Sequence, residues 1–190
     1  MLRVELINEK LHRAEAEILV VPFFSDRIPP KGVAGWIDWL LCGQLSSALE
    51  QGNLTGGRGE KAVLMGYGKF KAGRIMAYGL GEAEGILPPA FEGIFADLVG
   101  AVYDMGLKGF AASSMQTEFL LWDYEDLARA ILRGVYQGFS LAGPLSGDGF
   151  TTGIIEESSE RMRSLEDAAR EIRAKFRDKL DSEIIVPNAV

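Results

Sequence analysis

The stretch EILVVPFF, residues 17–24, constrains the fold more strongly than any other part of the chain. After Glu17 every residue is apolar, and polar and apolar positions do not alternate. A strand that faces solvent on one side alternates, whereas a strand covered by helices on both faces of a sheet does not. The run therefore predicts a central strand of an α/β sheet. It is also far shorter than the ~20 residues that a membrane-spanning helix needs.

Further strands and helices alternate along the sequence. Residues 2–7, LRVELI, alternate partly and predict an edge strand, and more strands are expected in KAVLMGY, RIMAYGL, GFAASS and FTTGIIEE. Apolar residues at helical spacing predict one helix over 33–50, one that begins near Pro88, and one that Asp123 caps. This order of elements indicates an α/β sandwich that contains parallel strand pairs.

The last part of the chain is typical of a charged amphipathic helix over residues 158–180. Its apolar residues recur at spacings of three and four: Met162, Leu165, Ala169, Ile172 and Phe176. Two interpretations remain open, because such a stripe packs equally well on its own domain or on another chain. We therefore expect one domain over residues 1–157 and a C-terminal helix and tail over 158–190. We also expect a homo-oligomer or a complex with a protein partner.

The charge of the chain restricts its partners. A net charge of −7 and an isoelectric point near 4.9 repel polyanions, so we expect no nucleic-acid partner. The first ten residues, MLRVELINEK, lack the apolar stretch of a secretory signal, and the single cysteine, Cys42, excludes an internal disulfide. These features predict a cytoplasmic protein outside the membrane, with Cys42 buried as a small hydrophobic residue.

Two glycine-rich segments are candidates for ligand-binding loops. RIMAYGLGEAEG, residues 74–85, places Gly79 and Gly81 directly after a predicted strand, where ligands of α/β proteins commonly bind. Its spacing differs from the dinucleotide-binding G-x-G-x-x-G pattern, so a simple turn at the strand exit is the alternative interpretation. SLAGPLSGDG, residues 140–149, adds Gly143 and Gly147 as further candidates.

No residue stands out as catalytic, and the sequence predicts neither a metal site nor a cofactor. His12 is the only histidine, which excludes a multi-histidine zinc site, and its polar surroundings predict a solvated turn residue. Asp123, Glu125 and Asp126 are expected to cap a helix. Three serines near predicted loops, Ser113, Ser114 and Ser146, lack the G-x-S-x-G context of a nucleophile, and Glu156, Glu157 and Glu160 simply lead into the last helix.

Several short motifs occur in a distinctive order over residues 33–84. They are a helix with Asp38 and GQLSSAL, a G-x-x-G-E turn at residues 56–60, a strand, and a second strand that ends in GLG. In this order the chain resembles the amino-terminal domain of the M17 leucyl aminopeptidases, over about residues 2–157. The resemblance implies a three-layer α/β/α macro-like domain with a mixed sheet, in which GLG is a strand-end turn. It also implies that the metal-binding catalytic site belongs to a separate carboxyl-terminal domain, whose N-T-D-A-E-G-R motif has no match here.

Two classes of function follow from this resemblance. The first is a stand-alone noncatalytic domain of the aminopeptidase N-terminal type that serves protein association or regulation. The alternative is a module that binds a small ligand, a nucleotide or ADP-ribose, as macro domains do. Their strand-end signature resembles D-A-I-V-N-A-A-N, whereas AEILVVPFF lacks the asparagines and has Glu17 near the strand start. An uncharacterised hydrolase is a third, less specific hypothesis.

Overall fold

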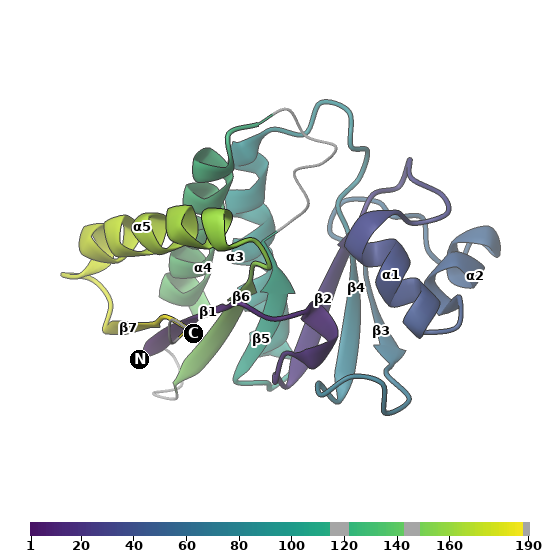
Figure 1. Cartoon of the computed structure of the whole chain (residues 1–190), viewed down its shortest axis with the longest axis horizontal. Helices are drawn as coiled ribbons and strands as arrows, with labels where there is room; N and C mark the ends of the chain where they lie inside the picture. The colour runs from purple at the N-terminus through teal and green to yellow at the C-terminus, as the bar shows by residue number, and fades with distance from the viewer. Residues whose placement is uncertain (115–121, 143–148, 188–190) are drawn as a thin grey trace.

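Seven strands form one mixed sheet in the computed structural model, which describes residues 1–114, 122–142 and 149–187 (Figure 1). The strand order is β3-β4-β2-β5-β6-β1-β7, and neighbours are parallel except for β3 and β4, which are antiparallel. The strands are β1 (Leu2–Ile7), β2 (Ile18–Phe23), β3 (Lys61–Met65), β4 (Arg74–Gly79), β5 (Gly109–Ser113), β6 (Phe150–Ile155) and β7 (Ser182–Ile185).

Helices cover both faces of this sheet. The bounds are η1 (Leu11–Arg13, a 3-10 helix), α1 (Gly32–Leu40), α2 (Gln44–Glu50), α3 (Pro88–Asp104), α4 (Tyr124–Ala142) and α5 (Ser159–Phe176). Buried residues of α3, α4 and α5 form one core cluster with Val20 and Tyr78, while α1 and α2 form a second cluster with Val21 and Ala77. Since neighbouring strand residues point to opposite faces, the sheet lies between two helical layers. The predicted α/β/α architecture with a mixed sheet is confirmed.

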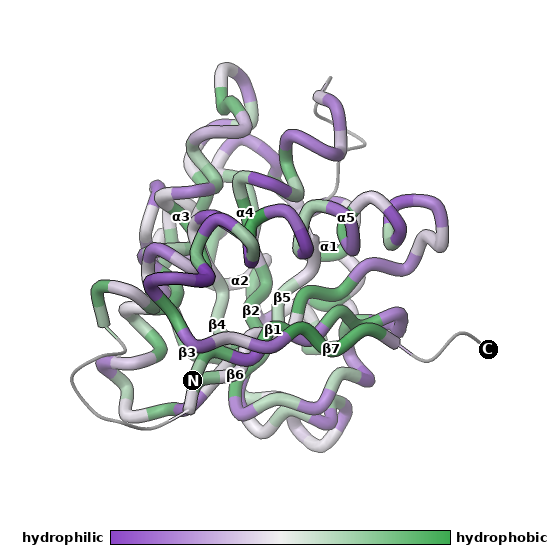
Figure 2. Tube along the Cα trace, turned by 90° about the vertical axis from the view of Figure 1, so that its left-hand side faces the viewer, coloured by the Kyte–Doolittle hydropathy of each residue, from purple (hydrophilic) through white to green (hydrophobic). Residues whose placement is uncertain are grey.

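The predictions for the central strand and for the edge of the sheet have different outcomes. β2 lies between β4 and β5, and Ile18, Leu19 and Val20 are fully buried, so the prediction of a central strand is confirmed. The prediction that residues 2–7 form an edge strand is wrong, because β1 lies between β6 and β7. β7 forms that edge, and Figure 2 views the molecule from the side on which it lies. Its four residues give too short a pattern to recognise in the sequence.

The single helix expected over 33–50 is two helices. Between α1 and α2 the chain adopts positive φ at Cys42 (57°) and Gly43 (80°), which ends α1. The Asp38 carboxylate then accepts hydrogen bonds from the backbone N–H groups of Leu45 (2.8 Å) and Ser46 (3.1 Å), and so caps the start of α2. Because Cys42 lies at this junction, it is exposed, and the prediction that it is buried is wrong.

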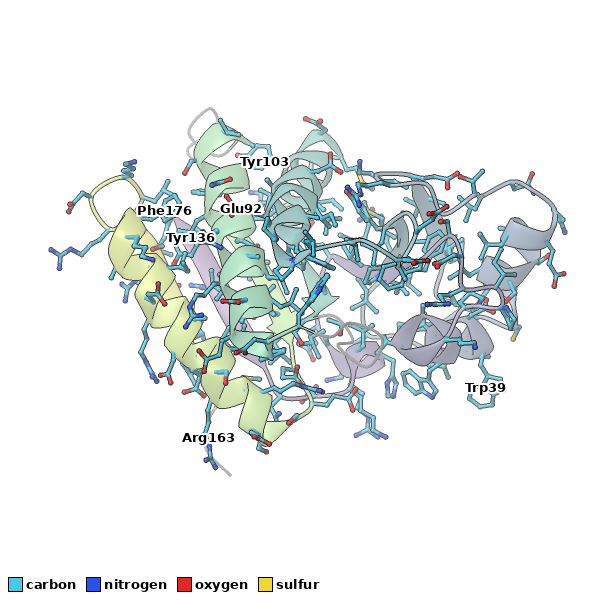
Figure 3. All side chains as sticks on the ribbon, turned by 90° about the horizontal axis from the view of Figure 1, so that it is seen from above. Trp39, Glu92, Tyr103, Tyr136, Arg163 and Phe176 are labelled. Carbon is cyan, nitrogen blue, oxygen red and sulfur yellow. The ribbon has the colours of Figure 1, made fainter. Side chains whose placement is uncertain are left out.

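The apolar stripe of the last helix packs on its own domain. Met162, Leu165, Ala169 and Ile172 are buried in the cluster that α3 and α4 form. Phe176 lies 5.2 Å from the ring of Tyr136 on α4, and Figure 3 shows these two side chains together. The stripe is therefore occupied within the chain, which removes the coiled-coil interpretation of it. The domain boundary between residues 157 and 158 stays a prediction.

Candidate functional site

A network of polar side chains lies where the parallel strands end. Glu156 follows β6 directly and is only 3% exposed. Its carboxylate accepts hydrogen bonds from the Ser114 hydroxyl (2.6 Å) and the backbone N–H of Ser158 (2.8 Å), and forms an ion pair with Arg161 Nη2 at 3.0 Å. A buried carboxylate needs such partners, because its desolvation is otherwise costly. Donors of the chain itself therefore occupy this carboxylate.

Two further side chains extend the network to neighbouring elements. Asn8, just after β1, donates to the Glu156 carbonyl oxygen at 2.8 Å. The Arg161 guanidinium lies 5.7 Å from the ring centroid of Tyr124, at the start of α4, and burial raises the pKa of that tyrosine well above its usual value. The network thus joins β1, β5, β6, α4 and α5, and we assign it a structural role.

Sequence reasoning treated Ser114 and Glu156 separately, Ser114 as a hydroxyl near a predicted loop and Glu156 as a residue that leads into the last helix. Each stands one position after a buried strand, β5 or β6, and these strands are parallel neighbours. The carboxyl ends of parallel neighbours meet at one edge of the sheet, and this signal could have paired the two side chains. The expected capping by Asp123 is observed, since its carboxylate accepts a hydrogen bond from Glu125 N at 2.9 Å.

A small cavity lies beside this network at the same edge of the sheet. Its volume is about 250 Å³, and its lining is Lys10, Leu11, Gly32, Val33, Trp36 and Glu157. The wall therefore combines one basic and one acidic side chain with an apolar floor. Glu157 is the residue after the buried Glu156, so the network holds one side of the cavity in place.

His12 packs against Trp36, one of the residues that line the cavity. Its ring lies 4.6 Å from that of Trp36 in an edge-on arrangement, so it is packed against α1 rather than fully solvated as predicted. Burial, together with the charges of Arg13 and Lys10, lowers the pKa of His12 below its usual value. The ring of His12 thus lies in edge-on contact with Trp36, which lines the cavity.

The glycines of the GLG segment pack against the turn at residues 56–60. A Cβ atom added to Gly79 would lie 2.2 Å from the Gly57 carbonyl oxygen, so only glycine fits there. Gly81, at φ +80°, donates to the carbonyl oxygen of Gly56 at 2.9 Å. The two glycines thus permit a close approach between two backbone segments. Ligand binding at Gly79 and Gly81 stays a prediction, and Gly143 and Gly147 lie outside the described residues.

The Glu60 side chain stabilises the same turn. Its carboxylate accepts hydrogen bonds from the backbone N–H groups of Thr55 (2.9 Å) and Gly56 (2.7 Å). Burial alone would raise the pKa of Glu60, but these hydrogen bonds outweigh it and hold the pKa below its usual value. The G-x-x-G-E motif is therefore a self-capped turn against which the GLG segment packs.

Within residues 1–114, 122–142 and 149–187, no group of three or more His, Cys, Asp or Glu side chains is placed to hold a metal ion. No helix in this part of the chain is long and apolar enough to cross a membrane.

The sequence profile of the cytosol aminopeptidase family, N-terminal domain, matches residues 20–139. The chain belongs to this family. The matched range runs from β2 into α4 and includes the G-x-x-G-E turn and the GLG segment. The resemblance inferred from the order of these motifs is thereby confirmed. No curated protein sequence matches the chain.

Solved structures of similar fold include an aminopeptidase and macrodomains. A tomato leucine aminopeptidase mutant has a TM-score of 0.64 at 17% identity, over 88% of this chain and 35% of the enzyme. A macrodomain mutant from Oceanobacillus iheyensis has a TM-score of 0.68 at 14% identity, over 90% of this chain and 92% of that one. The Trypanosoma brucei macrodomain in complex with ADP-ribose has a TM-score of 0.70 at 15% identity, over 86% and 68%.

These identities establish the fold and no more. The chain spans about a third of the length of the tomato enzyme, so that enzyme's activity does not transfer with the fold. The macrodomains establish that the predicted macro-like architecture is correct. Function has to be argued from the surface and the cavity of this chain.

Proposed function

We propose that this aminopeptidase N-terminal-type domain is noncatalytic and acts by associating with a second protein chain, in the first instance another copy of itself. Two exposed aromatic side chains carry the proposal. They are Trp39 near the end of α1 and Tyr67 in the turn after β3, which are 73% and 71% exposed. Figure 3 shows Trp39 projecting away from the body of the molecule. Such residues are enriched at the centres of protein interfaces and are costly to leave in water.

Two contacts join the segments that carry these side chains. Lys69 Nζ, in the turn after β3, lies 3.4 Å from Cys42 Sγ at the α1–α2 junction. Gln44 at the start of α2 donates to the Met65 carbonyl oxygen at 3.4 Å. The α1–α2 junction therefore adjoins the end of β3 and the turn that follows it.

The test replaces the aromatic anchors and measures mass in solution. Trp39→Ser with Tyr67→Ser is compared with Leu141→Ser, which changes a residue that is 80% exposed at the end of α4. Light scattering over a range of concentrations should show an oligomer for the unaltered chain and for the control, and a monomer for the double variant. A chain that stays monomeric at every concentration would overturn self-association.

The noncatalytic part of the proposal has its own assay. Leucyl substrates with a chromogenic amine should release no product above a mock-purified control in the presence of zinc, manganese or cobalt. Release that rises in proportion to the amount of purified protein would contradict this part of the proposal.

A second candidate function is the binding of a small ligand at the carboxyl edge of the sheet. The cavity lined by Lys10, Trp36 and Glu157 favours it, since it lies where ligands of α/β sheets bind. The macrodomain of Trypanosoma brucei, similar in fold, was solved with ADP-ribose. Thermal-shift measurements with ADP-ribose, nucleotides and other small molecules test this candidate, because a ligand that binds only the folded state raises the melting temperature.

A further inference from the structure

We propose that the cavity between η1, the start of α1 and Glu157 binds a zwitterionic small molecule, namely an α-amino acid with an apolar side chain. The inference rests on the proposed ligand-binding function and names the chemistry of its ligand. Three features of the cavity carry it: two opposite charges, an apolar floor, and the free end of a helix.

The two charges of the cavity are available to a ligand. Neither Lys10 nor Glu157 has an ion-pair partner within 4.0 Å among the described residues, and yet both line the same small space. Both also act electrostatically on His12, Lys10 lowering its pKa and Glu157 raising it. A ligand that carries only negative charge gains from Lys10 and is repelled by Glu157. A ligand with one charge of each sign is attracted by both.

The apolar floor and the volume set the size of the ligand. Leu11 is 2% exposed, and Val33 and Trp36 complete an apolar wall, with His12 fixing the indole ring at 4.6 Å. A volume of about 250 Å³ lies below the roughly 300–1,000 Å³ of pockets that enclose drug-sized ligands. A dinucleotide-sized molecule would extend well beyond the cavity, whereas a single amino acid fits within it.

The start of α1 favours a carboxylate at one end of the cavity. Gly32 and Val33 are the first residues of this nine-residue helix, and the residue before them, Lys31, makes no side-chain capping hydrogen bond. The first N–H groups of a helix lack intrahelical acceptors, and the helix dipole favours negative charge there. The carboxylate of the amino acid consequently lies toward Lys10 and α1. Its ammonium group lies toward Glu157, and its side chain rests on Leu11, Val33 and Trp36.

Calorimetric titration with four probes tests each of these contacts. The probes are L-leucine, leucinamide without a carboxylate, 4-methylpentanoate without an ammonium group, and ADP-ribose. L-leucine is expected to bind at least about tenfold more tightly than either leucine analogue, because each analogue leaves one cavity charge without its partner.

Paired protein variants locate the two charges. Lys10→Met should weaken L-leucine about tenfold but not leucinamide, and Glu157→Gln should weaken L-leucine but not 4-methylpentanoate, because each substitution removes a like charge that repels the analogue. Lys31→Met and Glu160→Gln are the matched controls, since these residues adjoin the cavity in sequence but do not line it. All four altered side chains are exposed, so melting curves without ligand should match that of the unaltered chain.

Each outcome decides between the inference and the function on which it rests. Weaker binding of L-leucine by each of the two variants, without weaker binding of the corresponding analogue, supports an amino-acid site. Binding of ADP-ribose without L-leucine overturns the inference but leaves ligand binding at this edge in place. Binding of L-leucine that neither variant weakens overturns the assigned site. If none of the four probes binds, both the inference and the ligand-binding candidate fail, and association alone remains.

Discussion

The two faces of the sheet differ in how tightly their helices pack. On the α3–α4–α5 face, α4 lies so close to α3 that a Cβ atom added to Gly134 would be 2.3 Å from the Glu92 carbonyl oxygen. On the other face, α1 and α2 cover β2, β3 and β4 with short helices. Beside them a groove of about 590 Å³ runs over β1 and β6, with Arg3 and Glu5 in its lining. The closely packed face determines the fold, and the more open face leaves side chains accessible to other molecules.

The largest expected effect comes from removing part of the closely packed face. A chain that ends at Glu157 loses α5 and β7, and thereby the buried Leu165 and Ile172. We expect it to be unfolded, because each large buried aliphatic side chain contributes about 2–5 kcal/mol and a domain has only about 5–15 kcal/mol in total. Near-ultraviolet circular dichroism and a melting curve check this. A cooperative transition close to that of the full chain would show that residues 158–190 are dispensable for folding.

The next effect concerns the contact between α3 and α4. Gly134→Ala should lower the free energy of unfolding by about 3 kcal/mol, because the added methyl group meets backbone and the two helices have to separate. Gly100→Ala is the matched control on α3, since no atom beyond its chain neighbours and the nearby backbone of its own helix lies within 4 Å of its added Cβ. Alanine favours a helix by up to about 1 kcal/mol over glycine, so the control should be neutral or stabilising. Urea unfolding curves measure the change in the free energy of unfolding for both variants. Equal changes would contradict the difference in packing.

How well the sequence predicted the structure also differs between the two faces of the sheet. The β2 run and the stripes of α3, α4 and α5 were predictable, because continuous burial and helical spacing directly reflect packing against a core. The break at Cys42 and Gly43 was missed, since leucines continue through it and the deciding contact joins Asp38 to residues seven and eight positions later. β7 was missed because its pairing partner, β1, lies at the other end of the chain.

The candidate site was less predictable than the fold. Lys10 and Glu157 are far apart in sequence, and each occurs in a charged stretch where a solvated side chain is the ordinary expectation. Only the parallel arrangement of β1 and β6 brings the segments that follow them together. The glycines of the GLG segment drew attention as a ligand loop, although their immediate neighbour is the backbone of residues 56–60.

On the more open face, loss of the Asp38 cap should destabilise α1 and α2. Asp38 is 7% exposed and accepts hydrogen bonds from Leu45 N and Ser46 N, so Asp38→Ala should cost about 1–2 kcal/mol. Hydrogen exchange should accelerate in α1 and α2 and change little in α4, because the closely packed face does not depend on this cap. Ser47→Ala, on the helix that Asp38 caps, is the control. Equal acceleration across both faces would contradict the independence of the two helical layers.

The smallest effect is a dependence of stability on pH through His12, also on the more open face. Burial lowers the pKa of His12 in the folded chain, so below the ordinary histidine value of about 6.5 the unfolded chain binds more protons than the folded one. The free energy of unfolding should therefore fall as pH drops from 7 through this value toward the lower, folded-state pKa. His12→Gln removes the titrating group while keeping a polar side chain beside Trp36, so the difference in stability between the two chains should change with pH over this window and level off at higher pH. Carboxylates that titrate at lower pH affect both chains alike and cancel in this difference. A difference that is constant from pH 7 to pH 5 would mean that His12 titrates alike in the folded and unfolded chain, and that its ring does not pack against Trp36 in solution.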